Sequence, residues 1–103
     1  MKDVDKSIEL PPPWYWTDIG LTVQLESEIS KTHILYGRTT KTLARRQDND
    51  DVLFLVDNEK FAVVHLTWVL KRLSDDQWPT TQFFDNWDDL YNKRILKDKE
   101  EFE

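Results

Sequence analysis

The sequence predicts an α+β fold in which an N-terminal helix, a curved antiparallel sheet of three to five strands and a C-terminal helix follow one another. Two apolar, β-forming runs, residues 52–56 and 61–68, flank the turn residues 57–60, which is the pattern of a hairpin. Apolar residues recur at helical spacing before and after these runs. We expect the sheet to bend into a half-barrel that the helices close, burying both apolar strands.

Length and composition indicate a single domain that spans residues 1–103. A chain of this length buries roughly two-thirds of the surface that its unfolded form exposes, which is enough for one core. Aromatic residues make up 13% of the chain, more than a disordered chain carries. The absence of cysteine excludes disulfides, thiolate nucleophiles and cysteine zinc sites.

The first 13 residues predict an extended arm. Pro11–Pro13 remove three backbone donors and restrict successive φ angles, so neither a helix nor a central strand can include them. The aromatic residues that follow directly, Trp14, Tyr15 and Trp16, are expected to hold the arm against the domain, with Trp14 and Trp16 partly exposed. The other tryptophans, Trp68, Trp78 and Trp87, lie beside predicted core strands or on an apolar helix face, so most are expected to be buried.

Residues 17–30 are compatible with a strand or a helix. Apolar residues alternate in the first half, as in a strand, whereas Leu21, Leu25 and Ile29 form one helical stripe. Thr17 as an N-cap and the good helix formers that follow favour the helix.

The sheet is expected to begin after this helix. Its predicted strands are residues 38–46, 52–56 and 61–68, joined by the turns 47–51 and 57–60, with an edge strand at 80–84. Pro79 limits this last strand to an edge position.

The C-terminal helix is predicted from a cap and an apolar face. Asn86 can cap it, Asp88 and Asp89 occupy the first turn, and the apolar face runs from Trp87 to Leu96. From residue 98 onward the chain is charged, so residues 98–103 are expected to form a frayed acidic tail.

Charge is unevenly distributed along the chain, whose formal net charge is −6. Residues 1–47 hold seven basic and six acidic side chains, whereas residues 48–103 hold seven and fourteen. Phosphate binding requires clustered Lys and Arg, and the sequence pI is about 4.9, so nucleic acid and anionic membranes are disfavoured. A basic protein partner is the electrostatic complement. The basic residues Arg38, Lys41, Arg45 and Arg46 are interpreted as internal ion pairs or a solvated strand face.

A cytoplasmic location is expected. No run approaches the ~20 apolar residues of a membrane span, and residues 1–5 lack the apolar core of a signal peptide.

The motifs predict no catalytic residue, no cofactor and no metal. The chain lacks a P-loop, a nucleophile elbow, a zinc-protease motif and a dinucleotide fingerprint, and its two glycines cannot form a phosphate cradle. The acidic run from Asp48 resembles the start of a calcium loop, but Leu53 stands where the loop requires glycine. We therefore interpret this run as a turn, an acidic contact surface, or both.

The two histidines are the remaining candidates for acid–base chemistry. His65 shares a strand face with Val63 and Thr67, and we interpret it as partly buried and bonded to a backbone or hydroxyl group. His33 is expected in a loop. A small hydrolase or ribonuclease that uses His65 with Asp51 or His33 remains an alternative hypothesis.

Four segments carry a resemblance to known proteins. They are Leu35-Tyr36-Gly37, Ala44-Arg45-Arg46-x-Asp48-Asn49-Asp50-Asp51-Val52-Leu53-Phe54, Phe61-Ala62-Val63-Val64-His65-Leu66-Thr67-Trp68 and Trp78-Pro79-x-Thr81. This pattern, over residues 33–84, resembles small bacterial proteins of similar length, some of which are immunity proteins of contact-dependent growth inhibition systems. The resemblance implies a protein that blocks a toxin domain, and it transfers no catalytic residue.

We therefore expect this protein to cover the basic active site of a cognate toxin domain, a nuclease or ribonuclease. The alternative is a small non-catalytic binding domain with a housekeeping partner. The predicted charge complements are Asp48, Asp50, Asp51, Asp75, Asp76, Asp88 and Asp89, and the predicted apolar anchors are Trp14 and Tyr15.

Overall fold

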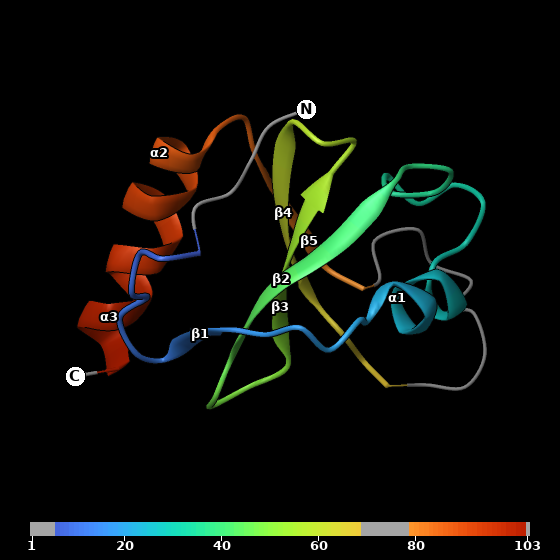
Figure 1. Cartoon of the computed structure of the whole chain (residues 1–103). Coiled ribbons are helices and arrows are strands. Elements are labelled where there is room, and N and C mark those ends of the chain that lie inside the picture. Colours follow the sequence, from blue (N-terminus) through green and yellow to red (C-terminus); the bar gives the residue numbers. More distant parts are fainter. Residues whose placement is uncertain (1–5, 69–78, 103) are drawn as a thin grey trace.

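Five strands form one open antiparallel sheet in which each strand pairs with the next along the chain (Figure 1). The computed structural model describes residues 6–68 and 79–102. The strands are β1 (Trp14–Trp16), β2 (Thr40–Arg46), β3 (Asp51–Val56), β4 (Lys60–His65) and β5 (Thr81–Phe84). The helices are α1 (Thr22–Glu28) and a C-terminal helix made of α2 (Trp87–Leu90), the π-helical segment η1 (Tyr91–Ile95) and α3 (Leu96–Phe102). The predicted α+β class is confirmed.

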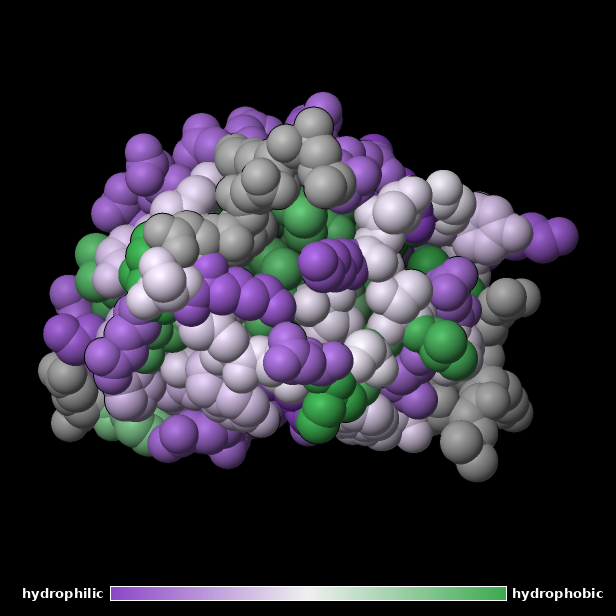
Figure 2. Space-filling model, in the orientation of Figure 1, coloured by the Kyte–Doolittle hydropathy of each residue, from purple (hydrophilic) through white to green (hydrophobic). Residues whose placement is uncertain are grey.

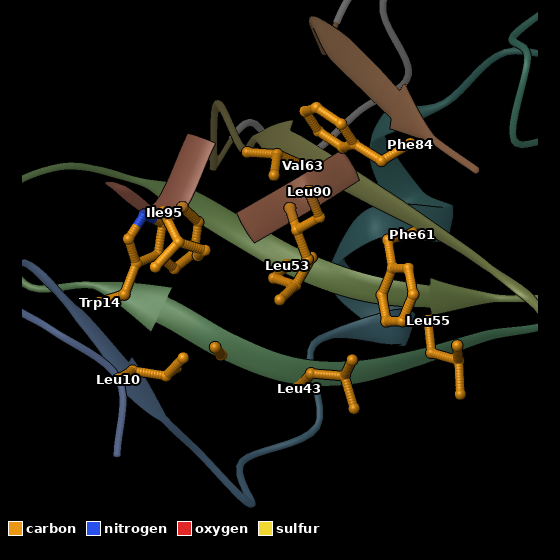
Figure 3. Close-up of a cluster of buried hydrophobic side chains, with 11 residues drawn as sticks. Leu10, Trp14, Leu43, Leu53, Leu55, Phe61, Val63, Phe84, Leu90 and Ile95 are labelled. Atoms are coloured by element: carbon orange, nitrogen blue, oxygen red, sulfur yellow. The ribbon is translucent and has the colours of Figure 1, made fainter. Parts of the chain in front are cut away.

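The sheet lies between two layers, because the C-terminal helix covers one face and α1 lies against the other (Figure 1). We call these the C-helix face and the α1 face. The buried cluster of the C-helix face contains Leu10, Trp14, Leu43, Ala44, Leu53, Leu55, Phe61, Val63, Phe84, Leu90 and Ile95 (Figure 3). The cluster of the α1 face contains Leu21, Leu25, Ile29, Leu35, Val52, Phe54, Val56, Ala62, Val64 and Leu66. The apolar runs of β3 and β4 thus alternate between two cores, which explains why they lack polar alternation.

A β-bulge in β2 changes the direction of the side chains that follow it. Thr42 pairs with Phe54, but Ala44 pairs with Leu53, so Leu43 is the extra residue. Because a one-residue shift exchanges the two faces of a strand, every side chain after Leu43 is reversed. Arg45 therefore pairs with Val52 of the α1 face, whereas the next residue points to the C-helix face.

The predicted hairpin between β3 and β4 is confirmed. Asp57 and Asn58 have φ angles of 52° and 60°, and the Glu59 N–H bonds to the Val56 carbonyl at 3.1 Å. Positive φ at both central residues is typical of a type I′ turn, whose twist matches that of the flanking strands.

The expected helix over residues 17–30 is largely absent. Only the seven residues of α1 are helical within this range, and the preceding residues 14–16 form the edge strand β1. Residues 17–21 form neither helix nor strand, and β2 bonds their backbone: the Thr17 N–H bonds to the Leu43 carbonyl at 3.0 Å, and the Leu21 N–H bonds to Thr42 Oγ1 at 2.8 Å. Hydrogen bonds to β2 therefore replace those of the predicted helix in this segment.

The C-terminal helix is confirmed, and it continues beyond its predicted end. Asn86 caps it by accepting a hydrogen bond from the Asp89 N–H at 2.8 Å. The expectation of a frayed tail from residue 98 is wrong, because α3 is helical through Phe102 and Asp98 is buried. Ionic contacts between Asp98 and the sheet hold this last turn in place.

The sheet is open, because its order is β1-β2-β3-β4-β5 and β1 and β5 form two separate edges. Its five strands lie within the predicted range of three to five. Within residues 6–68 and 79–102, no helix is long and apolar enough to cross a membrane.

Candidate functional site

Polar side chains concentrate where β2 turns into β3, at residues 47–50. We call this region the β2–β3 end. Asn49 Oδ1 accepts a hydrogen bond from the Asp51 N–H at 2.8 Å, and the Gln47 N–H bonds to the Pro13 carbonyl at 2.9 Å. A side-chain bond of this kind replaces a backbone turn contact, as predicted for this Asp/Asn-rich run. The turn is therefore ordered, and the N-terminal arm lies against it.

An ionic network joins the β2–β3 end to the C-terminal helix on the C-helix face. Its contacts, between charged atoms, are Asp48–Arg46 at 2.7 Å, Arg46–Asp98 at 3.3 Å, Asp98–Arg94 at 3.1 Å, Arg94–Asp51 at 2.9 Å and Asp51–His65 at 2.8 Å. Trp14 donates its indole N–H to Asp98 at 2.8 Å. Negative and positive groups alternate from Asp48 through Arg46, Asp98 and Arg94 to Asp51, so each buried carboxylate has a cationic neighbour.

The contact between Asp48 and Arg46, at the outer end of this network, shifts the pKa values of both groups. The hydrogen bond from Arg46 lowers the pKa of the Asp48 carboxyl, and the same bond raises the pKa of the Arg46 guanidinium. Both arrangements favour the charged forms, because each group stabilises the ion opposite it. The pair is therefore ionised at neutral pH.

A pocket of about 300 Å³ lies beside the network and is lined by Asp51, His65, Thr80, Thr81, Gln82 and Arg94. His65 Nδ1 is 2.8 Å from Asp51 Oδ1, and an ionised carboxylate can only accept, so Nδ1 carries the hydrogen. A neutral ring then has its acceptor lone pair on Nε2. The expected backbone or hydroxyl partner of His65 is thus replaced by a carboxylate.

The second histidine is separated from this pocket. His33 is buried, its Nδ1 accepts from the Leu35 N–H at 3.0 Å, and its Nε2 donates to the Pro79 carbonyl at 3.0 Å. His33 itself does not line the pocket, although its Nε2 lies 3.4 Å from the hydroxyl of Thr81, which does. Both ring nitrogens of His33 are bonded to the backbone, so its role in this structure is to hold the loop before β2.

A second, wider hollow of about 630 Å³ opens at the β2–β3 end beside β1. Three of the predicted contact residues, Tyr15, Asp48 and Asp50, line it. Tyr15 is 43% exposed and pairs across strands with Arg45, which also lines the hollow. The hollow thus brings together an exposed aromatic ring, two carboxylates and the guanidinium groups of Arg45 and Arg46.

Trp14 is wrongly predicted as a contact residue. It is 2% exposed and belongs to the core of the C-helix face, because alternation along β1 directs Trp14 inward and Tyr15 outward. Asp51 is also a poor contact, since its two carboxylate oxygens bond His65 and Arg94. Both oxygens of Asp48 are likewise bonded by Arg46, at 2.8 and 2.7 Å, whereas Asp50 forms no ion pair among the described residues.

The predicted acidic residues do not form a single surface. Asp88 and Asp89 lie in the first turn of the C-terminal helix, just after β5. This end of β5 pairs with Phe61, close to the β3–β4 hairpin. This is the opposite end of the sheet from Asp48, and Asp89 is paired with Lys93 at 2.7 Å. Asp75 and Asp76 lie outside the described residues. Hydrophilic residues are spread over the visible face rather than gathered in one patch (Figure 2).

Sequence reasoning missed the exposure of Trp68 and its contact with Arg45. The Arg45 guanidinium lies 5.6 Å from the centre of the Trp68 ring, and that ring is 41% exposed. The bulge at Leu43 directs Arg45 to this face, and no residue pattern indicated the bulge. Trp68 was expected in the core because it follows an apolar strand.

Comparison with family models, with curated proteins and with solved structures finds no match for this chain. Among the described side chains, no group of three or more His, Asp and Glu residues is arranged to hold a metal ion. The assignment of function therefore rests on the residues of the β2–β3 end.

Proposed function

We propose that the protein is a non-catalytic inhibitor, an immunity protein that binds the cognate toxin domain of a contact-dependent growth inhibition system in the cytoplasm. The toxin domain is a basic nuclease or ribonuclease, and the inhibitor covers its active site. The observation that carries the proposal is the hollow at the β2–β3 end, where exposed Tyr15 stands beside Asp48 and Asp50. The resemblance over residues 33–84 supports the same assignment.

The chemistry of the hollow suits a basic protein partner. Tyrosine is enriched among the residues that dominate binding energy, because it supplies a large contact area and loses little entropy. Carboxylates around such an anchor attract a cationic groove and raise the association rate. The chain also carries an overall charge of −6, which adds a long-range attraction.

The β2–β3 end is rigid enough to act as a preformed surface. The ionic network fixes the turn to the C-terminal helix, and the Asn49 bond holds its backbone. Preorganisation reduces the entropy lost on binding. A standard interface takes ~800 Å² from each partner, a small fraction of the 6279 Å² surface of this protein.

Co-purification and protection of cells test the proposal. The protein is expressed with the toxin domain encoded beside its gene, and we expect a stable complex and survival of the toxin-producing cells. The double variant Tyr15→Ala/Asp50→Lys should weaken both. Glu59→Lys, the matched charge reversal in the hairpin at the other end of the sheet, should leave both unchanged. Absence of a complex, or death of protected cells, ends the proposal.

The Asp51–His65 pair supports a second candidate function, a small hydrolase or ribonuclease. A histidine that is oriented by a carboxylate and lines a pocket is the arrangement of a general base. His65→Gln removes this base but keeps a polar side chain. Full protection by His65→Gln would count against the hydrolase and leave the inhibitor standing.

A housekeeping binding domain would use the same hollow with a different partner. In that case the neighbouring gene encodes no large secreted toxin, and the complex recovered from cells contains another basic protein. Identification of the gene beside this one separates the two proposals.

A further inference from the structure

The α1 face of the β2–β3 end carries a cation that the fold leaves without a counter-ion. Among the described residues, Arg38, Arg46 and Arg94 each contact a carboxylate within 3.1 Å, whereas Arg45 contacts none. The Arg45 Nε atom is buried and has no hydrogen-bond partner. A buried donor without a partner is costly, because it has lost its water and gained nothing in return. Arg45 is therefore a site with unused binding capacity.

The Trp68 ring lies against the Arg45 guanidinium, and the buried carboxylate of Glu28 holds the Trp68 backbone. Its backbone φ is 60°, a conformation that is rare for a bulky residue and costs free energy. Glu28, which is fully buried, stabilises it by accepting the Trp68 N–H at 3.0 Å. The same carboxylate accepts the N–H and the hydroxyl of Thr67, both at 2.7 Å. The fold thus presents an exposed indole ring at the cost of local strain.

Three residue types that dominate interface energies meet here. Arg45 pairs across strands with Tyr15, which is 43% exposed, and stacks near Trp68, which is 41% exposed. Trp, Tyr and Arg are the residues most enriched among energetic hot spots. Stacking on an aromatic ring leaves the edge of a guanidinium available for hydrogen bonds in its own plane.

We propose that Arg45, stacked on Trp68 and flanked by Tyr15, binds the carboxylate of one Asp or Glu side chain of the partner protein. Because Nε is buried, the two terminal NH2 groups supply the planar fork of N–H donors that matches the two oxygens of a carboxylate. Asp48 and Asp50 line the same hollow and repel a polyanion such as a nucleic acid, but a single side chain among basic neighbours can enter. This inference rests on the proposed inhibitor function and specifies one contact within it.

Affinity for an inactivated toxin domain provides the first test. Arg45→Met removes the fork and keeps the aliphatic stem, and we expect binding to weaken by roughly 30-fold or more, the level of a hot spot. Arg45→Lys should recover only part of the loss, because an ammonium cannot bind two oxygens in one plane. Lys41→Met, which removes an exposed cation from the same strand, is the matched control and should bind as the wild type does.

Charge reversal identifies the partner group. Arg45→Glu should abolish protection. Toxin variants that are then selected for binding to Arg45→Glu should carry a basic residue, Lys or Arg, in place of one particular Asp or Glu. If Arg45→Met binds the toxin domain as tightly as the wild type does, the inference about Arg45 is wrong. The proposed inhibitor function survives that result, because the complex still forms. Suppressors that lie only at basic toxin residues also overturn it.

A measurement without the toxin separates the two proposals. The Arg45 Nε–H resonance is followed by NMR while acetate or inorganic phosphate is added to the full chain. A saturable shift with acetate, lost in Trp68→Ala, supports the inference even if no toxin complex forms. Absence of any shift, or a response to phosphate stronger than to acetate, overturns the assignment to a carboxylate.

Discussion

Arg45 and Arg46 are adjacent in β2 and have opposite environments. Arg46 lies on the C-helix face, where Asp48 and Asp98 neutralise it, whereas Arg45 lies on the α1 face and has no acidic partner among the described residues. One face of the β2–β3 end is thus closed by internal charge pairing, whereas the cation on the other face has no internal counter-ion among the described residues. In the proposed function, this second face is the one that contacts the partner.

The largest effect is expected when Asp98, the carboxylate that joins Arg46 and Arg94 on the C-helix face, is neutralised. Asp98→Asn should destabilise the protein by about 3 kcal/mol, because Arg46 and Arg94 would be left partly buried without their shared carboxylate. Urea unfolding measures the change. Protection by the surviving folded protein should be unaffected, since Asp98 is buried and cannot contact a partner. A loss below about 1 kcal/mol would show that the network contributes little.

A smaller loss of stability is expected when Glu28, which holds the backbone of Thr67 and Trp68 on the α1 face, is changed. Glu28 accepts hydrogen bonds from the Thr67 N–H, the Trp68 N–H and the Gln24 amide. Glu28→Gln turns one acceptor into a donor that faces another donor, and we expect a cost of about 2 kcal/mol. Glu26→Gln, in the exposed face of the same helix, should cost nothing measurable in the same thermal unfolding experiment.

Glu28→Gln should also weaken partner binding, because it releases the strained backbone that presents Trp68. Unchanged affinity in a folded Glu28→Gln protein would mean that the position of the indole ring is irrelevant to the partner.

Arg45→Met should separate the two faces most directly. We expect a stability change within about 0.5 kcal/mol of zero, since the variant breaks no ion pair among the described residues and removes a donor that is already unsatisfied. Denaturant unfolding and binding are measured on the same sample. Parallel losses of stability and affinity would show that Arg45 supports the fold instead of the interface.

The smallest effect concerns acid stability. Because Arg46 lowers the pKa of Asp48 below its ordinary value of 3.8 in the folded state, the pair stabilises the protein above that value and loses this contribution as pH falls through the folded pKa. The contribution is below about 1 kcal/mol, since the side chain is one-third exposed. Unfolding curves of the wild type and Asp48→Asn should differ at pH 6 and converge in acid. A constant difference down to pH 2 would contradict this account.

Local patterns sufficed for the central part of the fold. The β-forming runs, the turn residues at 57–58 and the cap at Asn86 act within a few residues, so the hairpin and the C-terminal helix could be predicted. The helix over residues 17–30 could not, because its backbone groups bond to β2, some 20 residues away in sequence. Tyr15, Asp48 and Asp50 were predicted among nine contact residues, but only the pairing of β1 with β2 places these three in one hollow.

The amino-acid sequence by itself determined that two apolar strands would be buried on both faces, since their side chains leave no polar alternation. The tertiary structure alone decided which charges are satisfied within the fold. A one-residue bulge reverses Arg45 and Arg46, and the carboxylate that ties Arg46 to the C-terminal helix, Asp98, lies 52 positions further along the chain. Local pairs such as Arg46–Asp48 and Arg94–Asp98 follow from sequence spacing, but contacts between distant segments depend on distances that only the fold sets.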